Sequence, residues 1–358
     1  MKNESVSLKA SNDALSNESQ KSPSTIVVNN EPFLTLDPKS KLSFKDHSTI
    51  YNSLVSLVKG EYHFDKTLQD RAAQFLKILE PQWNAQLAAK LVTELVPSTD
   101  GSAAGFVESI VTLVSSPHST MVVAALSLLH KTILMSSTEI RHRPVQSDLV
   151  SKVFATVQPH TLPISGNDKI FDNLLIIIYR YLNLAVPLSL RELGITAAVD
   201  QSNHREMIFQ KVVLPSSQFF QYLISNRNML KGELLNSFMS LLTTHLRIGP
   251  FHDPTLEFVI ASPIVMAFSS CLSFIEDNSR LWVTLQHINY SFKEWKKEGP
   301  EVVQSGKRMI QALISEGFED TLEQKLMSNK GGDYGSSFDD YCHSISQRLG
   351  SNVEITAE

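Results

Sequence analysis

One stretch of the chain decides the fold: residues 103–137 read AAGFVESIVTLVSSPHSTMVVAALSLLHKTILMSS. Its first half places Phe106, Ile110 and Leu113 three or four residues apart, the spacing that lines one face of an α-helix. After Pro117 the second half repeats this spacing with the apolar residues Val122, Ala125, Leu126, Leu129 and Ile133. A helix with one apolar face needs a neighbour to cover that face. The stretch therefore predicts a helical hairpin that packs against further hairpins.

Similar helical patterns run outward from this hairpin in both directions, from Ser48 to Leu326. They are separated by residues that end helices, such as Pro97 and the pair Gly249-Pro250. Hairpins recur about every 35 to 45 residues, without a strict consensus. With 42% hydrophobic residues and only 14 glycines among 358, the chain can build a large core and lacks the turn density of an all-β protein. These features predict an all-α fold, an armadillo/HEAT-like superhelix of helical hairpins.

The hairpin resembles the helical pairs of the armadillo and HEAT families, whose repeats have about this length. Three segments also resemble a large family of uncharacterised armadillo-like proteins from anaerobic protists: FVESIVTLVSSPHSTMVVAALSLL from Phe106, VVLPSSQFFQYLISNRNML from Val212 and HDPTLEFVIASPIVMAFSSCLSFIEDNSRLWVTL from His252. The resemblance covers most of the chain from Leu54 to Leu326; it implies a fold and carries no catalytic residue over. The chain departs from peptide-binding armadillo proteins in having no repeated Trp-x-x-x-Asn ladder, since Trp282 is followed four residues later by Gln286.

The composition changes at both ends of the helical region. Residues 1–31 are rich in Ser, Asn, Glu and Lys and poor in apolar residues, which predicts a disordered tail. Ser22 precedes Pro23 and is the most specific phosphorylation signal of this tail, whereas the alternative is that its serines only keep it hydrated. Residues 329–358 turn polar again and predict a flexible tail. The helical repeat domain is expected to span residues 32–328.

Charge and cysteine content exclude several classes of protein. A net charge of −5 argues against nucleic-acid binding, which needs clustered Lys and Arg. The two cysteines, Cys271 and Cys342, lie too far apart to suggest a disulfide framework or a zinc site, which favours a reducing compartment. No apolar run approaches the roughly 20 residues that span a bilayer, and the first residues do not resemble a secretory signal. We expect a cytoplasmic protein, with the nucleus as the alternative, and no membrane contact.

No linear motif of catalysis or nucleotide binding occurs in the chain. His245 and His252 flank the Gly249-Pro250 turn, and Asp253 follows the second histidine. Because His and Asp can hold metals or transfer protons, this turn is the candidate position of a non-linear enzymatic or regulatory site. The alternative, which we favour, is that Asp253 caps the next helix and the histidines bond to free carbonyls. A metal site would need a third ligand that the local sequence lacks, so no metal or cofactor is expected.

Basic residues gather in two places that are candidates for binding a partner's acidic or phosphorylated segment. They are Arg141, Arg143 and Lys152 in the first patch, and Lys293, Trp295, Lys296 and Lys297 in the second. The alternative is a solvated face, because Glu294 and Glu298 lie among the lysines at spacings that allow pairs within one helix.

Repeated hairpins, absent catalytic motifs and polar tails together predict a scaffold that is not an enzyme and presents a helical-repeat surface to a protein partner. The alternative is a regulatory or enzymatic helical domain with a site near His245 and His252. Tight retention of a metal would favour that alternative.

Overall fold

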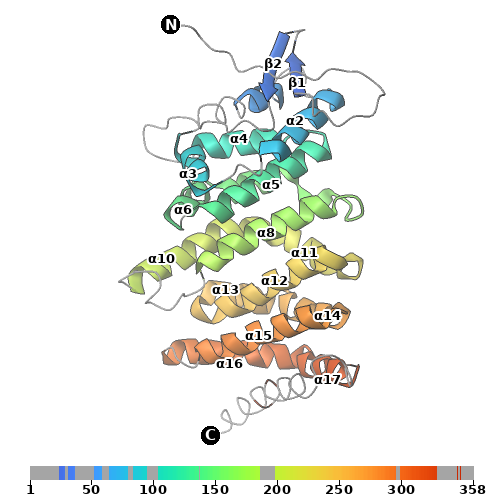
Figure 1. Cartoon of the computed structure of the whole chain (residues 1–358). Helices are drawn as coiled ribbons and strands as arrows, with labels where there is room; N and C mark the ends of the chain where they lie inside the picture. The colour runs from blue at the N-terminus through green and yellow to red at the C-terminus, as the bar shows by residue number, and fades with distance from the viewer. Residues whose placement is uncertain are drawn as a thin grey trace. The chain divides into compact units, whose positions relative to one another are not determined.

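The computed structural model describes residues 24–28, 31–36, 52–58, 64–79, 84–94, 104–136, 138–185, 198–295 and 299–328, together with residues 345 and 347 (Figure 1). Almost all of these residues are helical, and the all-α class is confirmed. The exception is one antiparallel pair of strands, β1 (Ser24–Val28) and β2 (Glu31–Leu36). Its register pairs Ser24 with Leu36 and is irregular between Ile26 and Val27.

The strand β1 lies within the N-terminal segment for which the composition predicts disorder. Ile26, Val27 and Val28 are β-branched, and such residues favour extended backbone even in a segment that is otherwise polar. Residues 1–23 of the expected tail lie outside the described residues, as does 329–344 at the other end.

Contacts divide the chain into two compact units between Gln158 and Pro159. The helices of the first unit are residues 52–58, α2 (Lys66–Leu79), α3 (Ala85–Glu94), α4 (Ala104–Val114), α5 (Ser119–Met135), α6 (Thr138–Gln146) and α7 (Leu149–Val157). The hairpin predicted from the sequence is α4 and α5, with Pro117 in the turn between them. The helix α5 packs on α2, α3 and α4, and it buries Leu126 and Leu129 completely.

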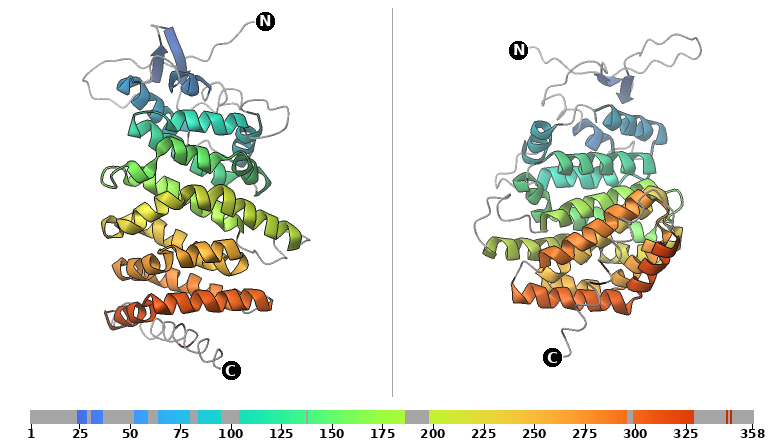
Figure 2. Two further views of the ribbon diagram at one scale, coloured as in Figure 1. Left: turned by 180° about the vertical axis from the view of Figure 1, so that it is seen from behind. Right: turned by 60° about the horizontal axis from the view of Figure 1, so that its bottom comes forward.

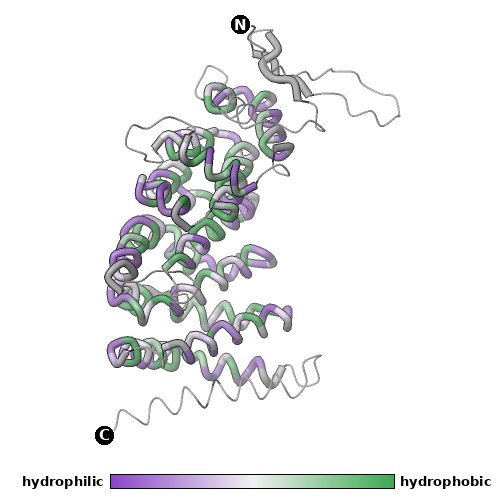
Figure 3. The backbone as a smooth tube through the Cα atoms, turned by 60° about the vertical axis from the view of Figure 1, so that its left-hand side comes forward, coloured by the Kyte–Doolittle hydropathy of each residue, from purple (hydrophilic) through white to green (hydrophobic). Residues whose placement is uncertain are grey.

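The second unit contains the 3₁₀ turn η2 (Pro159–Thr161), α8 (Asp168–Ala185), α10 (Ala198–Ile208), the π-helix η3 (Phe209–Val213), α11 (Leu214–Ser225), the 3₁₀ turn η4 (Arg227–Met229), α12 (Gly232–Ile248), the 3₁₀ turn η5 (Gly249–Phe251), α13 (Asp253–Ala261), α14 (Ile264–Phe274), α15 (Asn278–Trp295), α16 (Pro300–Ser315) and α17 (Phe318–Ser328). Its helices pack on one another in both views of Figure 2. Hydrophobic and hydrophilic segments alternate along each helix in Figure 3, as expected of helices with one apolar face.

Three long helices of the second unit run side by side in the same direction. The helix α12 packs against α8 on one side and α15 on the other. Near the helix starts, the Ser237 hydroxyl donates to Asp172 Oδ1 of α8 at 2.5 Å. Near the helix ends, the Arg247 guanidinium lies 5.2 Å from the ring centre of Tyr290 on α15. Contacts between matching ends mean that α8, α12 and α15 are parallel, so the helices between them must return the chain.

A π-helix joins α10 to α11 because of Pro215. Proline has no N–H and its ring crowds the carbonyl four residues earlier, so a regular α-helix cannot continue through this position unchanged. The chain widens instead: the Leu214 N–H donates to the carbonyl of Phe209, five residues back. The Ser216 hydroxyl donates to the carbonyl oxygens of Val212 and Val213 at 2.7 and 3.0 Å, which satisfies the altered turn.

Among the described residues, no single helix has the length and apolar composition needed to cross a membrane. The helices α13 and α14 reach that length and apolar composition only together, and they are bent by 64° relative to each other. Both helices bury apolar residues in the second unit, among them Leu256 and Phe268.

Candidate functional site

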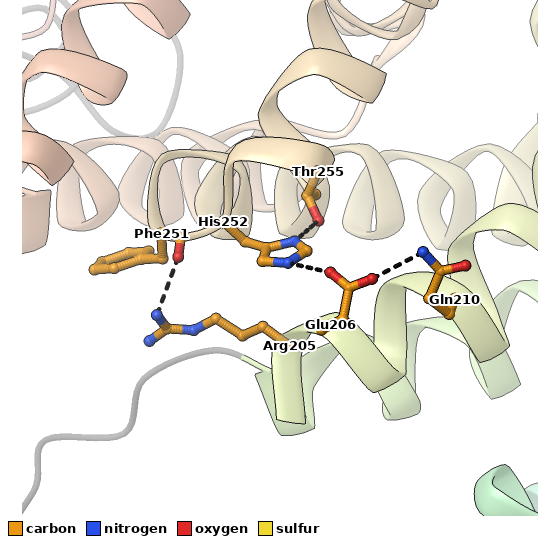
Figure 4. A network of polar contacts seen from close by, with 6 residues as sticks. All are labelled: Arg205, Glu206, Gln210, Phe251, His252 and Thr255. Atoms are coloured by element: carbon orange, nitrogen blue, oxygen red, sulfur yellow. Dashed lines mark hydrogen bonds and ion pairs between the residues drawn. The ribbon is translucent and has the colours of Figure 1, made fainter. Parts of the chain in front are cut away.

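The turn between α12 and α13 brings together a network of polar side chains from distant parts of the chain (Figure 4). His252 lies immediately before α13, and its Nε2 is 3.0 Å from Glu206 Oε2 of α10. Its Nδ1 is 2.9 Å from the hydroxyl oxygen of Thr255 in the first turn of α13. A carboxylate only accepts hydrogen bonds, so Nε2–H donates to Glu206 and Nδ1 accepts from Thr255. The neutral imidazole therefore has both of its nitrogens satisfied.

Neighbouring residues of α10 hold this network in place. The Gln210 amide donates to Glu206 Oε1 at 2.8 Å. Arg205 donates through Nη1 to the carbonyl of Phe251 at 3.1 Å and through Nε to the carbonyl of Ala185 at 3.4 Å. Its guanidinium also lies 5.1 Å from the ring centre of Phe251. Together these contacts tie α10 to the end of α8 and to the η5 turn.

Thr255, His252 and Glu206 are the residue types of a nucleophile, a base and an orienting acid. Their exposure is the opposite of what catalysis needs, because the hydroxyl is buried and the acid is exposed. Nucleophilic catalysis needs a hydroxyl that the substrate can reach and an acid that is shielded from water. Here Thr255 is only 2% exposed, whereas the Glu206 side chain is 48% exposed. Burial lowers the pKa of His252, although the hydrogen bond and charge of Glu206 raise it. The geometry is that of a clamp between α10 and α13.

His245 is completely buried and lies apart from this clamp. Its Nδ1–H donates to the carbonyl of Leu241 one turn earlier in α12, at 3.0 Å. Its Nε2 is buried without a hydrogen-bond partner, and the ring stands edge-on to Phe220 with centroids 4.9 Å apart. Burial lowers the pKa of His245 to about 4, the hydrogen bond to Leu241 opposing it only partly. The ring is therefore a neutral part of the core.

Two aromatic rings separate the histidines. Phe258 lies 6.3 Å from His245 and 6.2 Å from Phe209, and Phe209 lies 5.7 Å from His252, all between ring centres. The histidines therefore cannot share a metal ion in this arrangement. In the part of the chain that the structure describes, no group of three His, Cys, Asp or Glu side chains is placed to hold a metal.

The prediction that Asp253 caps α13 is wrong by one position. The helix begins at Asp253 itself, and His252 occupies the capping position without a side-chain hydrogen bond to the backbone. Asp253 remains favourable there, because a carboxylate in the first turn faces the positive end of the helix dipole. Sequence reasoning missed Glu206 and Arg205, which lie 46 residues from His252 and Phe251, respectively. Thr255 carried a local signal, since it lies three residues after His252, where a capping partner is expected.

In the first basic patch, the Arg141 guanidinium forms hydrogen bonds with the backbone at the end of α5. Its Nε and Nη2 donate to the carbonyl oxygens of Ser136 and Leu134, at 2.7 and 3.0 Å. These carbonyls belong to the end of α5, where a helix leaves its last carbonyls unsatisfied. Arg143 is half-buried, and Lys152 is exposed on α7. The structure therefore leaves Lys152 as the patch member that projects into solvent.

In the second basic patch, Trp295 does not belong to the surface. It is only 3% exposed, and its indole N–H donates to the carbonyl of Arg247 at 3.3 Å. The indole packs against Gly306 of α16, where a Cβ atom would come within 3.0 Å of the ring. Lys293 is exposed on α15. The remaining candidates, Lys296, Lys297 and the phosphorylation candidate Ser22, lie outside the described residues.

The chain matches no protein-family model, no curated protein and no solved structure. The described residues define a protein of packed helices, two of which, α10 and α13, are joined by a polar clamp.

Proposed function

We propose that this protein is a non-catalytic scaffold that binds another protein through the surface of an armadillo-like helical repeat. The observation that carries the proposal is the parallel succession of α8, α12 and α15, joined by the contacts of Asp172 with Ser237 and of Arg247 with Tyr290. Parallel helices with returning helices between them are the building plan of helical-repeat proteins, which bind partners along extended surfaces.

The chemistry of the described residues supports binding over catalysis. The hydroxyl–imidazole–carboxylate chain of Thr255, His252 and Glu206 has its hydroxyl buried. Burial raises the pKa of the Cys271 thiol to about 12, although the charge of Arg227 opposes this, so the thiol does not form the reactive thiolate. His245 has a core position between aromatic rings. None of these groups meets the requirement that a reacting atom be both activated and accessible.

The proposal is tested by expressing the tagged full-length chain in cells of its source and recovering it under mild conditions. Co-purifying proteins are quantified by mass spectrometry against an unrelated tagged protein, and bound metals are measured in the same sample. One protein recovered in near-equal amount, without metal, is the expected result. A metal held at one equivalent with no protein partner would reject the scaffold in favour of the enzymatic alternative.

A further inference from the structure

The helix α10 buries little apolar surface. Among residues 202–208, whose side chains the structure describes, only Ile208 is buried, whereas Ser202, Asn203 and Glu206 are exposed. The next helix along the chain, α11, buries four apolar side chains: Phe219, Phe220, Leu223 and Ile224. Segments with few buried apolar contacts have the lowest free energy of local opening in a folded protein. We therefore expect α10 to open more readily than α11.

Polar contacts of two neighbouring residues hold α10 in place (Figure 4). Arg205 donates to the carbonyl oxygens of Phe251 and Ala185, and Glu206 accepts from His252. Hydrogen bonds of this kind stabilise a folded structure modestly, because water offers the same groups new partners once the helix has left. The attachment of α10 can therefore break while the apolar core of the second unit stays intact.

The π-helix η3 interrupts the regular hydrogen-bond ladder between α10 and α11. The Leu214 N–H donates to the carbonyl of Phe209, five residues back, and Pro215 has no N–H to donate. Unfolding spreads cooperatively along a helix through an unbroken ladder of such bonds. An interruption at η3 therefore allows α10 to open without opening α11.

We propose that α10 is a detachable arm, which leaves the end of α8 and the η5 turn by opening about η3 while α11 and α12 stay folded. Arg205 and Glu206 are the residues that hold the arm closed. Opening exposes the carbonyl oxygen of Phe251 and the Nε2–H of His252 to solvent. The open and closed arms thus present different hydrogen-bonding groups at the surface of the second unit. The arm goes beyond the scaffold proposal and does not depend on it, because it concerns this chain alone.

The test is hydrogen exchange of the purified full-length chain at pH 7, measured by mass spectrometry on peptides from α10, α11 and α12. Arg205→Ala and Glu206→Ala remove the contacts that hold the arm. Asn203→Ala is the matched control, because Asn203 is exposed on the same helix. Alanine is the strongest helix former, so a loss of protection in the first two variants cannot come from lower helix propensity.

In the wild-type chain, the α10 amides should exchange about tenfold faster than the α11 amides, because fewer apolar contacts break when α10 opens. Arg205→Ala and Glu206→Ala should each speed the exchange of α10 by about threefold to tenfold, with α11 and α12 unchanged. Asn203→Ala should leave the exchange of α10 unchanged or slow it.

Other outcomes overturn the proposal. Equal exchange of α10 and α11 in the wild-type chain would mean that α10 opens only together with the core. Faster exchange of α11 and α12 in the two variants would mean that Arg205 and Glu206 support the whole unit. Unchanged exchange of α10 in these variants, or an equal acceleration by Asn203→Ala, would mean that the two residues do not hold the arm. Each of these results leaves the scaffold proposal standing, because co-purifying proteins decide that proposal.

Discussion

Replacing His245 should remove a defined part of the acid sensitivity of the second unit. His245 is completely buried, and its pKa falls from 6.5 to about 4 in the folded protein. The unfolded chain therefore binds a proton more readily than the folded chain does. The stability that the neutral ring contributes is fully present above pH 6.5 and is lost as the pH falls toward 4. A difference of about 2.5 pKa units corresponds to about 3 kcal/mol in total, of which about 2 to 3 kcal/mol is lost by pH 4.5.

The perturbation is His245→Gln, because glutamine keeps a donor for the carbonyl of Leu241 and has no ionisable ring. His245→Leu is the second variant, which removes the polar group as well. The assay is hydrogen exchange of the α12 amides at pH 7, 6, 5 and 4.5, which gives the free energy of opening of this helix. The free energy of opening of wild type should fall by about 2 to 3 kcal/mol relative to that of the variant between pH 7 and pH 4.5. A difference that stays constant over this range would refute the assignment of His245 as a buried neutral ring.

Three further substitutions test other parts of the structure. Arg141→Ala removes two hydrogen bonds to the end of α5. It should lower the free energy of unfolding of the first unit, measured by urea denaturation, by about 1 to 3 kcal/mol. An unchanged free energy of unfolding would mean that these hydrogen bonds do not stabilise the unit. Glu206→Gln removes the carboxylate that raises the pKa of His252, so the pKa measured by NMR should fall further; an unchanged value would contradict the clamp. Gly306→Val drives a side chain against the indole of Trp295 and should cost about 1 to 3 kcal/mol by thermal denaturation, whereas an unchanged melting temperature would mean that the ring can move aside.

Periodicity is sufficient to predict the helical hairpin on which the all-α prediction rests. The hairpin of α4 and α5 follows from Phe106, Ile110 and Leu129, which recur at helical spacing and are buried as that spacing requires. Local spacing works here because the helix repeats within a few residues, so the sequence itself contains all the information needed to define its apolar face.

The candidate site could not be predicted in the same way, because its contacts depend on residues far apart in the chain. Glu206 and His252 are in contact although they lie 46 residues apart, and the local sequence of neither residue indicates the other as its partner. The lysines beside Trp295 predict a basic surface, yet the absence of a side chain at Gly306 makes room for the indole in the core. Arg141 looked like free positive charge, but the end of α5 uses its guanidinium. A sequence shows which residues are charged, whereas the groups that each charge contacts depend on how the chain packs.

The π-helix before Pro215 fixes the rotational phase of α10 relative to α11 as well as joining them. A turn that closes five residues back holds one residue more than a regular turn, and each residue advances a helix by about 100°. Deleting a single residue between Phe209 and Val213 would therefore turn α10 about its axis by roughly that angle. Glu206 would then point away from His252, although both residues would still be present. The wide turn therefore determines whether α10 directs Glu206 toward His252, which lies 46 residues further along the chain.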